Sequence, residues 1–291
     1  MLTSSHRQAP PISHHRAVTQ IIPGLPAADG AGVRLTRFLG TAALPILDPL
    51  LLLDMMHSDQ PQDYVAGFPN HPHRGFETVT YVLAGKVRHE DNKGHRGVIE
   101  PGGVQWMTAG RGIVHSEMPE QTDGLLWGFQ LWLNLPAAEK MTAPKYQEFD
   151  ASEIPEEGRD GVTVRAIAGR TSQGTTGPIQ PAATEAIYWD LILEAGQTFT
   201  ESLPLTHNAF LVVYEGEVTV QAEGQGQAIS TGTLAVLGAG DRLELSTAKG
   251  GRALLIAGKP LNEPVAHGGP FVMNTQAEVL QAQRDFLAGR F

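Results

Sequence analysis

The 291-residue chain contains no cysteine, which excludes a disulfide framework, a thiol nucleophile and a thiolate metal site. Any metal site must therefore use nitrogen and oxygen ligands, and the 11 histidines are the first candidates. No run is long and apolar enough for a membrane helix, since two prolines and two aspartates interrupt the most apolar stretch, Leu44 to Met56. The first 20 residues also lack the apolar segment of a secretory signal. We expect a soluble, cytoplasmic protein with no membrane partner.

Basic residues are scarce as well. The 21 Lys+Arg against 31 Asp+Glu give a net charge of −10, and no Lys/Arg-rich run appears. This balance argues against direct binding of nucleic acid, which needs a clustered basic surface. Glycine and proline are abundant instead, at 33 and 20 residues, and 41% of the chain is hydrophobic. The composition is typical of a folded protein with many turns and short strands.

The apolar residues follow the two-residue period of β-strands. From Leu125 to Leu135, Trp127 and every second residue after it are apolar. An apolar strand, a glycine turn and a second strand recur at 79–87 and at 210–218, an offset of 210 − 79 = 131 residues. The fold class is therefore predicted to be all-β, with two barrels or sandwiches and a link near residues 136–160.

One short helix is expected at the C-terminus. Thr275 and Glu278 have the spacing of a capping box, and apolar residues then recur as far as Leu287. Gly289 is a good terminator. We interpret this element as a packing helix.

Two pairs of potential ligands carry the chemistry. His71 and His73 flank Pro72, and their imidazoles point to the same side of an extended chain. His115 and Glu117 have the same spacing further along. If the two segments face each other, three imidazoles and one carboxylate converge, a donor set that suits a divalent first-row metal. Open coordination positions would make the site catalytic rather than structural.

The other histidines are expected to have different roles. His89 and His95 flank a polar hairpin and are interpreted as solvated turn residues. His57 is only a weak candidate for the mouth of the site, and His207 stands alone in the second half, where a structural role is expected.

At these residues the chain resembles the pirin family of the cupin superfamily. The segments His71–Val79 (HPHRGFETV) and Gln105–Pro119 (QWMTAGRGIVHSEMP) carry the likeness. Further matches lie at residues 47–49, 54, 146–148, 160–164 and 267–275, so that the resemblance spans most of residues 30–285.

The resemblance implies two consecutive cupin (jelly-roll-like) β-barrels. Residues 1–140 would form a metal-binding barrel, residues 160–263 a metal-free barrel, and residues 264–291 would pack on the first. The usual cupin acidic ligand would be Glu77, whereas in pirins it is the position of Glu117. Strand parity supports Glu117 but does not exclude Glu77. The predicted metal ligands are therefore His71, His73, His115 and Glu117.

The resemblance also implies an activity. Some pirins open the ring of quercetin with O₂, which makes quercetin 2,4-dioxygenase the expected reaction, with Glu117 as the general base. One divalent ion per chain is expected, Fe(II) being favoured and Cu, Ni, Mn, Co or Zn possible alternatives. The expected partners are a flavonol-like small molecule and O₂, and the expected oligomeric state is a monomer.

A different class of function stays open. Pirins also act as regulatory proteins that bind a protein partner under control of the metal's redox state, and Arg34, Arg37 and Arg74 are candidates for a charged docking surface. Turnover of quercetin by metal-loaded protein discriminates between the two. A sugar isomerase on the same fold is less favoured because no anion clamp is evident.

Overall fold

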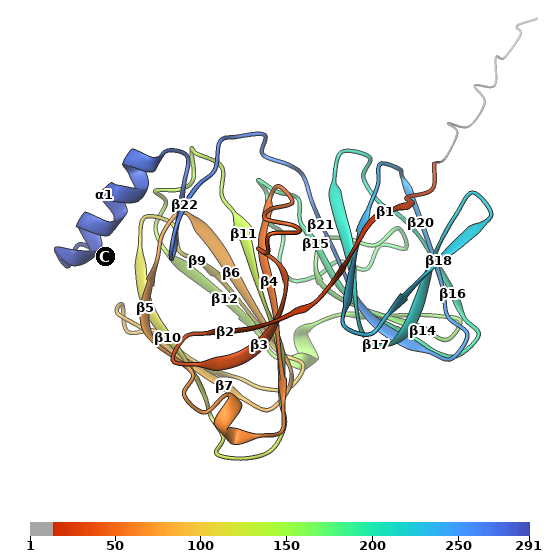
Figure 1. Cartoon of the computed structure of the whole chain (residues 1–291), viewed down its shortest axis with the longest axis horizontal. Helices are drawn as coiled ribbons and strands as arrows, with labels where there is room; N and C mark the ends of the chain where they lie inside the picture. Colours follow the sequence, from red (N-terminus) through yellow and green to blue (C-terminus); the bar gives the residue numbers. More distant parts are fainter. Residues whose placement is uncertain (1–13) are drawn as a thin grey trace, which may run out of the picture.

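A computed structural model describes residues 14–291, so that residues 1–13 of the predicted first domain lie outside the described residues. The chain forms two β-rich halves side by side, with the C-terminal helix at the outer end of the first half (Figure 1). The all-β prediction is confirmed. Within residues 14–291, no helix has the length and apolar character needed to cross a membrane.

The first half consists of two sheets. In spatial order, the seven-stranded sheet contains β12 (Lys145–Phe149), β9 (Val104–Thr108), β6 (Phe76–Ala84), β11 (Leu126–Asn134), β4 (Leu50–Ser58), β3 (Val33–Leu39) and β2 (Leu25–Asp29). The four-stranded sheet contains β5 (Phe68–His73), β10 (Ile113–Pro119), β7 (Val87–Asp91) and β8 (Arg96–Ile99). Two short 3₁₀ turns, η1 (Pro61–Asp63) and η2 (Ala151–Glu153), complete the connections.

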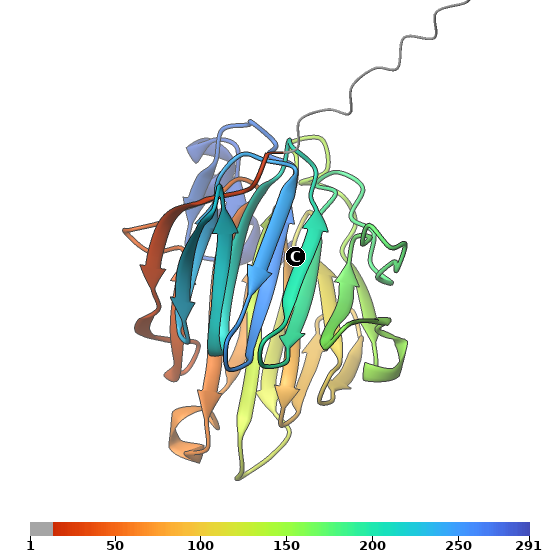
Figure 2. The ribbon, with the colours of Figure 1, turned by 90° about the vertical axis from the view of Figure 1, so that its right-hand side faces the viewer.

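The second half is built on a ten-stranded sheet, whose strands lie side by side in Figure 2. Its main path is β1 (Val18–Pro23), β19 (Thr233–Leu237), β17 (Asn208–Ala222), β21 (Gly251–Gly258), β15 (Ile187–Leu193), β14 (Val162–Ala168) and β13 (Glu156–Arg159). Three further strands pair off this path, namely β16 (Thr198–Ser202), β18 (Gln225–Ser230) and β20 (Arg242–Ser246).

Segments cross between the halves. Strand β1, near the start of the chain, pairs with β19 of the second half. The C-terminal segment returns to the first half through the hairpin β22 (Ala266–Gly268) and β23 (Phe271–Met273), where Val272 packs with Phe76. The predicted helix follows as α1 (Gln276–Leu287), the one α-helix within residues 14–291, and both hydrogen bonds of its capping box are present.

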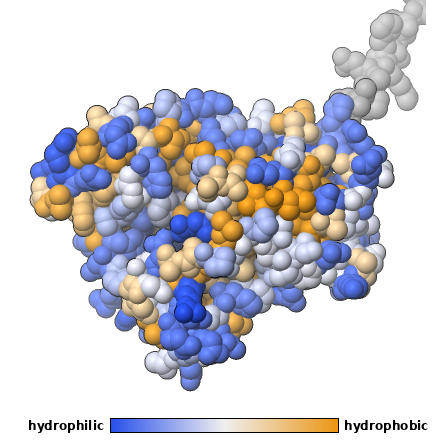
Figure 3. Space-filling view, viewed as in Figure 1, coloured by the Kyte–Doolittle hydropathy of each residue, from blue (hydrophilic) through white to orange (hydrophobic). Residues whose placement is uncertain are grey.

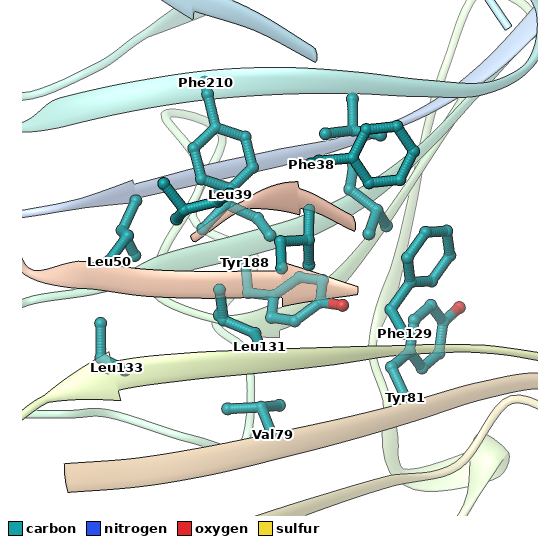
Figure 4. Packing of buried hydrophobic residues seen from close by; sticks show 14 of the residues in the cluster. Phe38, Leu39, Leu50, Val79, Tyr81, Phe129, Leu131, Leu133, Tyr188 and Phe210 are labelled. Carbon is teal, nitrogen blue, oxygen red and sulfur yellow. The ribbon is translucent and has the colours of Figure 1, made fainter. Parts of the chain in front are cut away.

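The main core lies between the halves. Alternate residues of β6 and β11 pack against alternate residues of β15, β17 and β21, as the two-residue period of a strand requires. Figure 4 shows Tyr81, Phe129 and Leu131 of the first half beside Tyr188 and Phe210 of the second. This shared layer uses one face of each large sheet and leaves the other faces to line the two barrel interiors.

Candidate metal centre

Three histidines meet where β5 pairs with β10. The strands are antiparallel and place His71 directly opposite His115, while His73 follows two residues later on the same side of β5. The ring centroids of His71 and His115 are 4.4 Å apart, those of His73 and His115 are 5.0 Å apart, and one ring nitrogen from each of the three residues lies within 4.8 Å of the others. Facing strands thus bring together both histidine-bearing motifs.

The environment of two of these rings, those of His73 and His115, favours neutral imidazoles. His115 is fully buried and His73 is 3% exposed. Burial, followed by the neighbouring imidazoles, lowers the pKa of both rings well below the usual value. Both ring nitrogens of His115 and Nδ1 of His73 lack a hydrogen-bond partner among residues 14–291. Because buried polar atoms are normally paired, these neutral nitrogens fit the requirements of a metal ion.

His71 is oriented by its own backbone. Its Nδ1 donates to the carbonyl oxygen of Pro69 at 2.8 Å. A backbone carbonyl can only accept, so Nδ1 carries a proton, and in the neutral form of the ring the lone pair lies on Nε2. Metal-binding histidines usually have such a hydrogen bond on the second nitrogen.

The two glutamates considered from the sequence lie in different places. Glu117 is 6% exposed and its Oε1 accepts from the Thr80 hydroxyl at 2.7 Å, which leaves the carboxylate beside the histidines but outside their 4.8 Å group. Glu77 belongs to a new strand, because the chain turns at Gly75 with φ of 89°. It accepts from Thr108 on the face of β6 that also bears Val79, away from the barrel interior.

His71 and His73 line a cavity of about 620 Å³, a volume typical of small-molecule sites. Strongly hydrophilic residues gather on this face between β22 and β2, and the main hydrophobic patch lies over the second half (Figure 3). The residues that line the cavity include Asp29, Leu35, Arg37, Asp54, Met56, Phe68, His71, His73, Glu117, Gln130, Trp132, His267 and Pro270.

Sequence reasoning missed the polar wall of this cavity. Arg37 on β3 donates to both carboxylate oxygens of Asp54 on β4, at 2.8 and 2.7 Å. Asp54 is in register with Gln130 on β11, which is in register with Thr80 on β6. The sequence offered one sign of this wall, because Gln130 is a polar residue at an inward position of the otherwise apolar strand β11.

Among the remaining histidines, the structure corrects the expectation for His89 and agrees with those for His95 and His207. His89 is 1% exposed rather than solvated, because β7 passes between β8 and β10 and brings its Nε2 to the Glu148 carboxylate. His95 is exposed as expected and contacts Asp91 at 2.8 Å. His207 has a structural contact, since Nε2 donates to the carbonyl of Glu185 at 3.0 Å.

The three arginines do not form one exposed surface. Arg74 is 4% exposed, pairs with Asp285 of α1 at 2.7 Å and stacks over the ring of Phe291. Arg37 is held by Asp54 as described above. Arg34 has an exposed side chain, 3.4 Å from Asp63. The expected charged surface is absent because Arg74 and Arg37 pair with Asp285 and Asp54, which are distant in the sequence.

Comparisons with known proteins agree with this architecture. The family model described as pirin matches residues 32–133, and that of the pirin C-terminal cupin domain matches residues 188–291. A pirin-like protein of Caulobacter vibrioides is 54% identical over 95% of this chain and 99% of its own length. Human pirin is 43% identical over 89% of this chain and 88% of its own length.

A solved structure is similar along nearly the whole chain. The crystal structure of a quercetin 2,3-dioxygenase from Acinetobacter baumannii has a TM-score of 0.87 and 35% identity, and covers 95% of this chain and 98% of its own. The match confirms the predicted arrangement of two cupin domains with one short C-terminal helix. The chain therefore belongs to the pirin family.

Proposed function

We propose that this protein is a metal-dependent dioxygenase that opens the ring of a flavonol with O₂, as a quercetin 2,4-dioxygenase does. The observation that carries the proposal is the group of three imidazoles, of which those of His71 and His73 line a cavity of about 620 Å³. The similar Acinetobacter structure, described as a quercetin 2,3-dioxygenase, supports the substrate class.

We assign His71, His73, His115 and Glu117 as the residues that would hold one divalent ion. Nitrogen and oxygen ligands suit Fe(II), our preferred ion, and also Mn, Co, Ni, Cu or Zn, among which affinity alone does not select a metal. When bound, the ion would lower the pKa of a coordinated hydroxyl and stabilise the resulting anion.

The chain's own residues supply the remaining steps. Glu117 takes the proton of the flavonol 3-hydroxyl as general base. Phe68, Leu35 and Trp132 line the cavity and offer apolar surface for the substrate rings. The flavonol then combines with one O₂, and the products are one carbon monoxide and one depside, which balances the atoms of both reactants.

The test uses protein whose metal content is known. Elemental analysis is combined with an assay of quercetin loss, O₂ uptake and carbon monoxide release under air, for protein loaded with each metal in turn. We expect one metal per chain and equal consumption of quercetin and O₂ with at least one ion. Stoichiometric metal binding without loss of quercetin under any loading contradicts the proposed reaction.

A further inference from the structure

The structure points to Thr80 as a residue that positions Glu117, with Gln130 holding Thr80 in turn; this inference rests on the role proposed for Glu117. Thr80 lies on β6 and is 2% exposed, facing the interior of the first barrel. Glu117 lies on β10 in the other sheet. The 2.7 Å contact between them therefore joins the two sheets at the cavity wall.

The single hydroxyl hydrogen of Thr80 determines which group donates in this contact. The Thr80 hydroxyl lies 2.7 Å from Oε1 of Glu117 and 2.8 Å from Oε1 of Gln130, but it has a single hydrogen. An ionised carboxylate only accepts, so Thr80 donates to Glu117. The amide group of Gln130 must then donate an N–H to the Thr80 oxygen. A rotation of the amide by about 180° exchanges its oxygen and nitrogen and places the N–H there.

This arrangement divides the tasks of the two carboxylate oxygens. Thr80 holds Oε1, whereas Oε2 of Glu117 has no hydrogen-bond partner among the described residues 14–291. Oε2 is thus left for a metal ion. A hydrogen bond to a charged acceptor is stronger than a neutral one, so the Thr80 hydroxyl fixes the side chain against rotation before any ligand arrives.

The same strand supplies a matched control. Thr78 is also 2% exposed and, two residues before Thr80, points to the same face of β6. Its hydroxyl has no side-chain hydrogen bond to any residue in 14–291. Replacing either threonine by valine makes the same chemical change, but only the change at Thr80 removes a donor from Glu117.

The experiment titrates metal-free protein with Fe(II) alone under argon, and with Ni(II) as a second probe. Partners of metal ligands typically contribute 10- to 100-fold in affinity, so we expect a loss of roughly that size for Thr80→Val. Thr80→Ser should restore most of the affinity, and Thr78→Val should bind as the wild type does. Equal affinities of the Thr80→Val and Thr78→Val proteins would overturn the inference.

A second comparison tests whether Thr80 acts through Glu117 or whether its replacement perturbs the fold in general. In a Glu117→Ala background, which removes the carboxylate that Thr80 contacts, Thr80→Val should have little further effect on affinity, because the two changes act on one contact. A full additional loss shows that Thr80 does not act through Glu117. If Thr80→Val fails to fold, as judged by thermal unfolding of the metal-free protein, Gln130→Met removes the donor to Thr80 and should weaken Fe(II) binding less than ten-fold but measurably; unchanged binding also overturns the inference.

Neither readout needs turnover. A wild-type protein that binds Fe(II) but leaves quercetin unchanged removes the proposed reaction, while the affinities still decide whether Thr80 positions Glu117.

Discussion

The interiors of the two barrels differ although their strands follow the same pattern. On β6 the residues that point into the first barrel include Thr78 and Thr80. On β17 the corresponding face carries Leu211 and Val213, which belong to an apolar core inside the second barrel. The opposite faces are alike, since both contribute large apolar residues to the layer between the halves.

The offset of 131 residues between the repeats allows individual residues of the two barrel interiors to be compared. Adding 131 to Thr80 gives Leu211, so a hydrogen-bond donor in one barrel corresponds to a core leucine in the other. By the same offset, His71 and His73 correspond to Ser202 and Pro204. Mutual packing constrains the shared faces, whereas each interior is free to hold either a packed core or a polar site.

The largest effect is expected from removing a central histidine. His115→Ala deletes a buried nitrogen ligand, so metal content should fall from one ion per chain to none and quercetin turnover should be lost. His207→Gln in the second barrel is the matched control and should keep one ion. Metal analysis after dialysis measures both. An ion that persists in His115→Ala protein places the site elsewhere and removes the contrast between the barrels.

The next effect separates metal binding from proton transfer. Glu117→Gln keeps the shape of the side chain but cannot take a proton, so part of the metal should be retained while turnover falls about 10²- to 10⁴-fold. Turnover is measured per bound metal, with Thr78→Val as the control. Full turnover by the glutamine variant removes the base role.

A core change in the second barrel should act on stability alone. Leu211 is fully buried, and Leu211→Ala leaves a cavity that costs about 2–5 kcal/mol of unfolding free energy. Because this interior is separate from the proposed site, the metal content of the folded variant should stay at one per chain. Urea denaturation and metal analysis check the two parts. A loss of metal from folded Leu211→Ala protein means that the two interiors are coupled.

The smallest effect concerns the layer that joins the barrels. Asp190 of β15 is fully buried and accepts from Tyr81 of the first half at 2.8 Å and from Tyr214 of the second. Burial raises its pKa in the folded protein. The folded state therefore holds this proton more tightly than the unfolded state, and the associated stability is present below the ordinary aspartate range and lost as pH rises through the folded pKa.

Asp190→Asn removes that dependence. The difference in the free energy of unfolding, variant minus wild type, should be smallest near pH 4 and should grow as pH rises, by about 1.4 kcal/mol for each unit of pKa shift. Thermal unfolding of the metal-free proteins across this range measures the difference. A gap that shrinks with rising pH contradicts the raised pKa.

Much of the fold was predictable because its signals are local. The alternation from Leu125 to Leu135 predicted β11, and the capping box at Thr275 predicted the start of α1. The placement of His71, His73 and His115 also followed from the two-residue spacing, once two extended segments were assumed to face each other. The resemblance to pirins supplied the choice of Glu117 over Glu77, which parity alone did not require.

The sequence by itself determined the strands, the helix, the absence of thiol ligands and the ligand types available for a metal. Tertiary structure alone decided that Glu77 faces away from the histidines, that His89 is buried beside Glu148, and that Arg74 pairs with Asp285. It also decided that Thr80 and Gln130 meet Glu117. The physical reason is that periodicity sets the direction of a side chain along its own strand, whereas its partner depends on the register between strands that are distant in the sequence.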